Sequence, residues 1–224
     1  MKKLLFLLFF LPLISFSQIN QYNKNGEKHG EWKVYYENGQ LKEEGSWKDG
    51  KQDGLLRGFH ENGQIWGEGN MKDGKEEGLW KFYYENGQLH YEGNWKDGKE
   101  EGLWKVYYDN GHLREEGNWI DGKREGMQKL YWSWRNGQLK EEGNRKDGKR
   151  EGVQKVYYDN GHPTEEGNWK DGKREGVSKL YYHNGQLKEE GNFKNGEKHG
   201  KWKFYHRTGT PNGEKTFKDG EEIN

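Results

Sequence analysis

The sequence predicts an all-β fold, an elongated single-layer antiparallel β-meander of about eight 24-residue hairpin repeats, twisted or curved. Three observations support this fold class. One sequence pattern recurs eight times between Gly30 and Asn224, each copy contains two glycine-bearing turn dipeptides, and no segment after residue 18 has the apolar spacing of an amphipathic helix. A fixed period of this size indicates a repeat architecture.

The N-terminus precedes the repeats and is expected to be a signal peptide. Lys2 and Lys3 form a charged start, residues 4–16 are an apolar run broken by Pro12, and small serines precede a cleavage site before Gln18. The run is short for a membrane-spanning helix. We therefore expect residues 1–17 to be removed on export and the protein to be periplasmic, in the outer envelope or secreted. An uncleaved anchor is the alternative.

Residues 18–29 read as an N-terminal partial repeat, and residues 30–224 as eight repeats, numbered one to eight by their first turn. That turn is Asn-Gly or its substitute, which in a type I′ hairpin needs φ > 0 at both positions. In repeat one a two-residue loop would pair Tyr36 with Leu41, Tyr35 with Lys42, and Trp32 with Gly45. The glycines expected to be essential to these turns are Gly39, Gly63, Gly87, Gly111, Gly137, Gly161 and Gly185.

A second turn, Asp49-Gly50 and its equivalents, joins each hairpin to the next one. Treated as a two-residue turn, it places Leu56 opposite Glu43 and Gly58 opposite Leu41, so that the apolar face continues on one side of the sheet. Each repeat then adds two strands, or about 9.5 Å of length, and eight repeats make a twisted ribbon on the order of 75 Å long.

Side-chain alternation assigns the residues of a repeat to two faces. One face is expected to carry Trp32, Val34, Tyr36, Leu41 and Trp47, and the other Lys33, Tyr35, Lys42, Glu44 and Ser46. The otherwise polar second face has an aromatic residue in the Tyr35 column of every repeat. Four members of that column are candidate binding residues: Tyr83, Tyr107, Tyr131 and Tyr157. Packing over lysine stems and stacking on a ligand both remain open for them.

The repeat pattern Gly-x-Trp-Lys-x-Tyr-Tyr-x-Asn-Gly-Gln-Leu-x-x-Glu-Gly-x-Trp-x-Asp-Gly resembles the MORN repeat family. It is most similar to the bacterial variant found in antitoxin components of toxin–antitoxin modules, the YwqK-like group. The resemblance extends over residues 25–220. It implies an elongated, curved sheet of stacked hairpins that serves as a binding scaffold, and it implies no shared enzymatic activity.

Repeat five departs most from this pattern. It has two extra residues within 131–137, and Arg145 replaces its second tryptophan. A regular ribbon presents the same surface eight times, so specificity is expected where the repeat is broken. Tryptophan and arginine are enriched at binding hot spots, which makes Trp132, Trp134 and Arg135 candidate binding residues. The alternative is a longer loop that only folds back over Tyr131.

The composition argues against several classes of protein. The formal net charge is +0 with lysine and glutamate interleaved, which argues against a nucleic-acid surface. The chain has no cysteine, and its eight histidines lack the short spacings of a zinc site. Acidic residues recur in every repeat, whereas a catalytic pair should be unique. We therefore expect no enzyme, no metal and no cofactor.

These observations predict an exported, non-enzymatic repeat scaffold that binds a protein partner, with an antitoxin or immunity-type role suggested by the resemblance. The alternative is cell-wall or carbohydrate binding, because the aromatic hairpins are similar to those of choline- and glucan-binding repeats. A membrane surface is a less favoured partner, since the chain without residues 1–17 has a net charge of about −2 and is attracted little to anionic lipid. A second copy of the chain is a further candidate partner.

Overall fold

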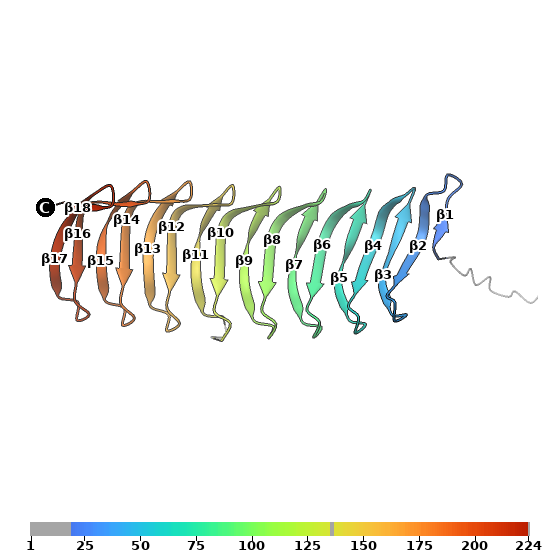
Figure 1. Cartoon of the computed structure of the whole chain (residues 1–224), viewed down its shortest axis with the longest axis horizontal. Helices are drawn as coiled ribbons and strands as arrows, with labels where there is room; N and C mark the ends of the chain where they lie inside the picture. Colours follow the sequence, from blue (N-terminus) through green and yellow to red (C-terminus); the bar gives the residue numbers. More distant parts are fainter. Residues whose placement is uncertain (1–18, 135–136, 224) are drawn as a thin grey trace, which may run out of the picture.

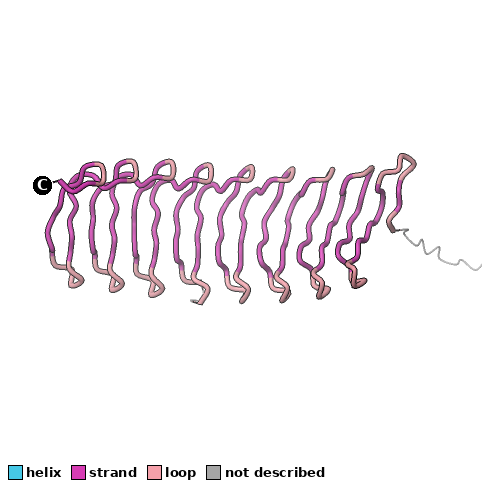
Figure 2. Tube along the Cα trace, in the orientation of Figure 1, coloured by secondary structure: helices cyan, strands magenta, loops and turns pink. Residues whose placement is uncertain are grey.

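The computed structural model describes residues 19–134 and 137–223, which form one open sheet of 18 antiparallel strands. Each strand pairs with the next one in sequence, so the chain is a continuous meander (Figure 1). The described residues contain strands and turns but no helix (Figure 2). The predicted all-β meander is confirmed. Two of the sequence predictions, the signal peptide and Arg135, lie outside the described residues.

The strands are β1 (Gln21–Tyr22), β2 (Lys28–Tyr35), β3 (Leu41–Lys48), β4 (Lys51–Phe59), β5 (Ile65–Lys72), β6 (Lys75–Tyr83), β7 (Leu89–Lys96), β8 (Lys99–Tyr107), β9 (Leu113–Ile120), β10 (Lys123–Tyr131), β11 (Leu139–Lys146), β12 (Lys149–Tyr157), β13 (Pro163–Lys170), β14 (Lys173–Tyr181), β15 (Leu187–Lys194), β16 (Glu197–Tyr205), β17 (Pro211–Lys218) and β18 (Glu221–Ile223).

The fully described Asn-Gly turns, such as Asn38-Gly39, are not the predicted type I′ turns. Tyr36 N donates to Gln40 O at 2.8 Å and Gly39 N donates to Tyr36 O at 2.9 Å, so the loop has three residues, 37–39. Gly39 has φ of +85°, and Asn38 is not among the residues with positive φ. This is a type I turn followed by a left-handed glycine, the usual three-residue hairpin. Asn38 instead uses its side chain, whose Oδ1 accepts from Gln40 N at 3.0 Å.

The longer loop changes the register next to the turn. Tyr35 pairs with Leu41, so the predicted Tyr36–Leu41 and Tyr35–Lys42 pairs are wrong. Lys42 forms a bulge, and the pairs beyond it, from Val34–Glu43 to Trp32–Gly45, are as predicted. Leu41 therefore shares the face of Tyr35, while Lys42 Nζ lies 5.5 Å from the ring centroid of Tyr36. Both face assignments are opposite to the prediction, because one bulged residue inverts the alternation.

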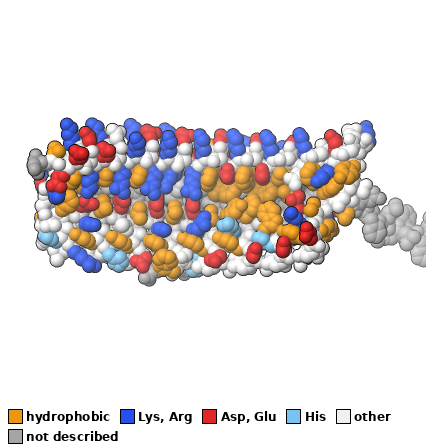
Figure 3. Space-filling view, in the orientation of Figure 1, with side chains coloured by type: hydrophobic (Ala, Val, Ile, Leu, Met, Phe, Trp, Pro, Cys, Tyr) orange, Lys and Arg blue, Asp and Glu red, His pale blue; other side chains and the backbone are white. Residues whose placement is uncertain are grey.

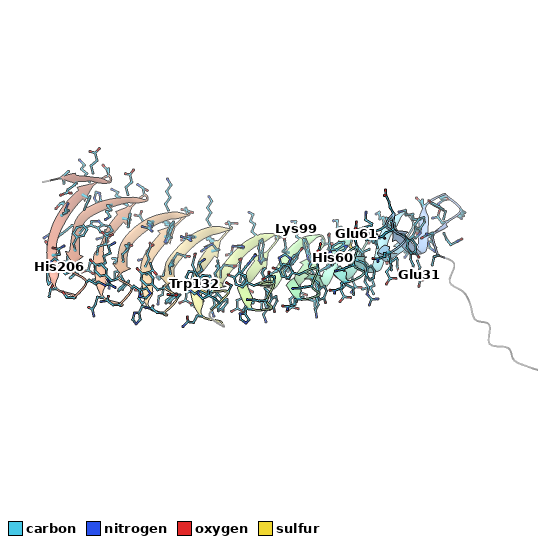
Figure 4. The ribbon with its side chains drawn as sticks, turned by 60° about the horizontal axis from the view of Figure 1, so that its bottom comes forward. Glu31, His60, Glu61, Lys99, Trp132 and His206 are labelled. Atoms are coloured by element: carbon cyan, nitrogen blue, oxygen red, sulfur yellow. The ribbon has the colours of Figure 1, made fainter. Side chains whose placement is uncertain are left out.

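The Asp-Gly turns have two residues, with φ of +48° at Asp49 and +80° at Gly50. The pairs beyond them differ from the prediction, because Leu56 pairs with Gly45, and Gly58 with Glu43. Two extra residues near Gly54, which has φ of +111°, produce this shift. Equivalent bulges recur along the sheet, and the strands curve along their length (Figure 4).

The core is built on a column of side chains on one face, which we call the inner face, with Met71 and Phe193 buried beside it. The column consists of Trp32, Leu56, Trp80, Trp104, Gln128, Gln154, Ser178 and Trp202, of which the last six are buried. Trp104 lies flat over Gly93, where a Cβ would be 2.2 Å from the indole ring. Its Nε1 donates to Asn94 O at 3.2 Å. Because Gly93 has no side chain, the indole of Trp104 can lie directly on the backbone of the sheet and become buried there.

The opposite, outer face carries rows of lysine or arginine beside glutamate. Lys33 lies 3.4 Å from Glu44, and Arg57 lies 3.3 Å from Glu68. Side chains in these pairs are partly exposed, so each contributes little to stability. The same arrangement recurs through the repeats, so the outer face is nearly uniform along the ribbon.

Candidate interaction surface

The outer-face tyrosines predicted as binding residues make hydrogen bonds within the sheet. The hydroxyls of Tyr83, Tyr107, Tyr131 and Tyr157 donate to Glu68, Glu92, Glu116 and Glu142 at 3.2, 3.2, 2.7 and 2.8 Å. Burial, then the hydrogen bond and the charge of Glu142 raise the pKa of Tyr157 to about 12. The phenol groups therefore have partners inside the chain and join each hairpin to its neighbour.

A second ladder joins successive Asn-Gly turns on the inner face. Tyr84 Oη donates to the main-chain oxygen of Tyr107 at 2.8 Å, and Tyr108 Oη to that of Tyr131 at 2.9 Å. Asn86 Nδ2 also donates to Asp109 O at 3.0 Å. Figure 4 labels three members of the Tyr84 column, His60, Trp132 and His206, at separate positions along the ribbon.

Repeat five interrupts this ladder with Trp132. Its Nε1 is buried and has no hydrogen-bond partner among the described residues. The Trp132 ring lies 5.0 Å from that of Trp134, and Lys140 Nζ lies 4.5 Å from the Trp132 ring centroid. Trp134 itself is 65% exposed. The insertion therefore places one indole in the ladder and the other in solvent.

The inner face also has a continuous row of aromatic contacts in repeats two to four, between strands β5 and β9. We call it the aromatic stripe: Trp66, Phe82, Tyr91, Trp95, Trp104 and Trp119. Phe82 stacks on Trp66 at 6.2 Å and on Tyr91 at 4.2 Å between ring centroids. Trp104 continues the row, with contacts to Tyr91 at 6.0 Å, Trp95 at 5.5 Å and Trp119 at 6.4 Å. Hydrophobic side chains gather over this half of the ribbon (Figure 3).

In the C-terminal half, charged side chains replace the aromatic ones at the same level of the inner face (Figure 3). Each of four glutamates, one hairpin apart, pairs with a basic residue of the following strand. The pairs are Glu115–Arg124 at 2.5 Å, Glu141–Arg150 at 2.7 Å, Glu165–Arg174 at 2.6 Å and Glu189–Lys198 at 2.8 Å. Tyr91 takes the glutamate position in repeat three, and Glu76 and Glu100 take the basic position in repeats three and four.

The change along the inner face was not predicted from the sequence. Its signal is present in the repeat pattern: the position of Glu76 and Glu100 becomes arginine or lysine from Arg124 onward. The equivalent side chains also meet at the start of the ribbon, where Gln52 Nε2 donates to Glu43 Oε1 at 3.4 Å. Arg145, noted as a departure, joins this network at 3.3 Å from Glu141.

Within residues 19–134 and 137–223, no group of three or more histidine or acidic side chains is arranged to hold a metal ion. The same described residues include no helix that is long and apolar enough to cross a membrane.

Comparison with protein families finds a match to the family described as MORN repeat variant. Its model matches seven segments that together cover more than half of the chain: 28–49, 52–73, 76–97, 100–121, 150–171, 174–195 and 198–219. The unmatched interval between the fourth and fifth segments is repeat five, with its two-residue insertion and Arg145. No curated protein matches the chain.

Proposed function

Since the chain belongs to the MORN repeat variant family, we propose that it is an exported, non-enzymatic scaffold that binds a protein partner through its inner face. One observation supports this proposal above the others. The aromatic stripe forms an unbroken row of ring contacts from Trp66 to Trp119 on a sheet that no second layer covers within the described residues.

Such a row is suited to protein recognition. Aromatic residues are enriched in the centres of protein–protein interfaces, where they bury large areas with little loss of side-chain freedom. Trp66 at one end of the stripe is 36% exposed, whereas Trp104 in its middle is 7% exposed. The stripe thus has a buried ring, Trp104, that is held in place by the sheet, and a more exposed ring, Trp66, that a partner can cover.

The antitoxin or immunity-type role is a finer proposal. It rests on the resemblance of the repeats to bacterial toxin–antitoxin proteins and on the signal peptide expected at residues 1–17. Export makes a toxin that acts outside the cytoplasm the fitting partner.

Site-specific photo-cross-linking in the native host tests the scaffold proposal. A photoreactive phenylalanine analogue is placed at Phe82 on the stripe, and in the control at Lys105 on the outer face, where Lys105 pairs with Glu116. We expect a protein adduct from position 82 and none from position 105. Equal adducts from both positions, or none from position 82, contradict binding through the inner face. Intact mass of the exported protein tests removal of residues 1–17.

Carbohydrate binding is the second candidate, and the exposed indoles favour it. Trp66 and Trp134 are 36% and 65% exposed, and exposed indoles are suited to stacking on sugar rings. Sedimentation with peptidoglycan and cell-wall polysaccharides tests it, with Trp66→Ala and Trp134→Ala as variants. Binding that both variants retain, or no binding at all, rejects this candidate.

A further inference from the structure

In the C-terminal half of the inner face, basic side chains lie over the aromatic rings. Arg124 lies over Trp119 with the guanidinium carbon 5.4 Å from the ring centroid, and Arg150 lies over Trp169 at 4.7 Å. Lys198 Nζ lies 4.0 Å from the Trp202 centroid. A cation over a ring face is attracted by the ring quadrupole. In these repeats the chain therefore supplies its own cations to its inner-face rings.

Repeats three and four lack these cations. The positions of Arg124 and Arg150 are taken by Glu76 and Glu100, and no ion pair involves either carboxylate within the described part of the chain. Glu100 pairs across the strands with Trp95, and its charge, after burial, helps to raise the pKa of Tyr91. Glu100 is thus adjacent to aromatic rings, whereas Glu76 pairs across the strands with Met71. At both positions the cation found in the later repeats is absent.

We propose that this part of the aromatic stripe binds a partner segment that supplies two basic side chains, arginine or lysine, at Glu76 and Glu100. This inference rests on the proposed protein-binding function and names the chemistry of the partner. The bound side chains take the place that Arg124, Arg150 and Arg174 have in the repeats that follow. Arginine fits best, because its planar group can stack on a ring while it pairs with a carboxylate.

The repeat spacing defines the sequence of the segment. Glu76 and Glu100 are one repeat apart, and two strands correspond to about 9.5 Å. A polyproline II segment rises about 3.1 Å per residue with three residues per turn, so residues i and i+3 are about 9.3 Å apart on the same side. A β-strand places i and i+3 on opposite sides. The stripe therefore fits an Arg-x-x-Arg segment in the polyproline II conformation.

The stripe also limits the number of basic residues. At the next repeat the partner would meet Arg124, which already covers Trp119 and pairs with Glu115. A third arginine at i+6 would face this like charge. Two basic residues, and not a longer basic run, complement the stripe.

Isothermal titration calorimetry with synthetic peptides tests the proposal on the mature chain. The probe is acetyl-Gly-Pro-Pro-Arg-Pro-Pro-Arg-Pro-Pro-Gly-amide. One control peptide has citrulline in place of both arginines, which keeps the shape and removes the charge. A second control has the arginines two residues apart. We expect the probe to bind at least tenfold more tightly than either control.

Two protein variants locate the site. Glu76→Arg with Glu100→Arg supplies the cations internally and should weaken probe binding at least tenfold, and Glu76→Gln with Glu100→Gln should weaken it without added bulk. The matched control, Glu61→Arg with Glu85→Arg, changes the net charge equally at two exposed turns and should bind as the wild type does. Circular dichroism verifies that each variant is folded.

Three results overturn the inference: no binding of the probe, equal binding of the citrulline peptide, or equal loss in the Glu61/Glu85 control. The proposed function fails separately, if position 82 cross-links no protein in the host. Cross-linking at position 82 without probe binding rejects the basic segment and leaves the scaffold function in place.

Discussion

Gln128 makes the hydrogen bond that Trp104 makes one repeat earlier. Its Nε2 donates to Asn118 O at 3.0 Å, and Trp104 Nε1 donates to Asn94 O at 3.2 Å. Gln128 is 1% exposed and also donates to Glu125 O at 3.2 Å. In repeats five and six glutamine replaces tryptophan in the core column, and it keeps the hydrogen bond to the main-chain oxygen of the asparagine.

This relationship predicts that Gln128→Ala destabilises the protein. The substitution leaves Asn118 O without its side-chain donor and removes buried volume, so we expect a loss of about 1–3 kcal/mol in the free energy of unfolding. Urea denaturation followed by circular dichroism measures the change. Gln186→Ala, at an exposed turn, is the control and should have little effect. Equal stability of Gln128→Ala and the wild type would show that the bond contributes nothing.

A second prediction compares two glycines with the same position in the repeat. A Cβ on Gly93 would lie 2.2 Å from the Trp104 ring, whereas a Cβ on Gly167 would lie 3.4 Å from Ser178 Oγ. Gly93→Ala must displace the indole, and we expect it to cost about 1–3 kcal/mol. Gly167→Ala has room and should be neutral or stabilise by up to about 1 kcal/mol. Thermal unfolding of both variants measures the two changes in stability. An equal loss at the two positions would contradict the close contact between Gly93 and the Trp104 ring.

The sequence was sufficient to predict the repeat period, the antiparallel meander and the Trp32–Gly45 pairing. It was insufficient at the bulges. Asn38-Gly39 forms a two-residue loop if φ of Asn38 is positive and a three-residue loop if it is negative. Asparagine can adopt either sign of φ, so the dipeptide does not decide between them. That single residue decides which face Leu41 and Lys42 occupy. Alternation leaves Glu141 and Arg150 on one face but several residues apart along the strands, so their contact at 2.7 Å needs the three-dimensional structure.

A third prediction concerns high pH. The pKa of Tyr157 is raised to about 12 by burial and by Glu142, above the ordinary value of 10.0. A group with a raised pKa in the folded state contributes stability that is fully present below pH 10 and is lost as pH rises toward 12. The difference in absorbance at 295 nm between the wild type and Tyr157→Phe should therefore show ionisation well above pH 10. Glu142→Gln should lower that midpoint, and an unchanged midpoint would exclude Glu142 as a cause.

The last prediction is that Trp132→Tyr restores, in repeat five, the hydrogen-bond ladder of the Tyr84 column. Tyr84 and Tyr108 each donate to a main-chain oxygen of the next repeat, but Trp132 in the same column has a buried Nε1 without a partner in the described residues. Trp132→Tyr should place a hydroxyl within reach of Tyr157 O and remove the unpaired donor. A hydrogen bond of this kind contributes about 0.5–1.5 kcal/mol, so we expect a gain of that order in the free energy of unfolding.

Urea denaturation measures this gain, with Trp134→Tyr as the matched control. Trp134 is 65% exposed, so the same chemical change at that position should leave the stability unchanged. Hydrogen exchange adds a local measurement, because the restored ladder should slow exchange in the turns of repeats five and six. A stability gain in both variants would indicate an effect of tyrosine itself. A loss in Trp132→Tyr alone would show that contacts of the indole with Trp134 and Lys140 outweigh its unpaired donor.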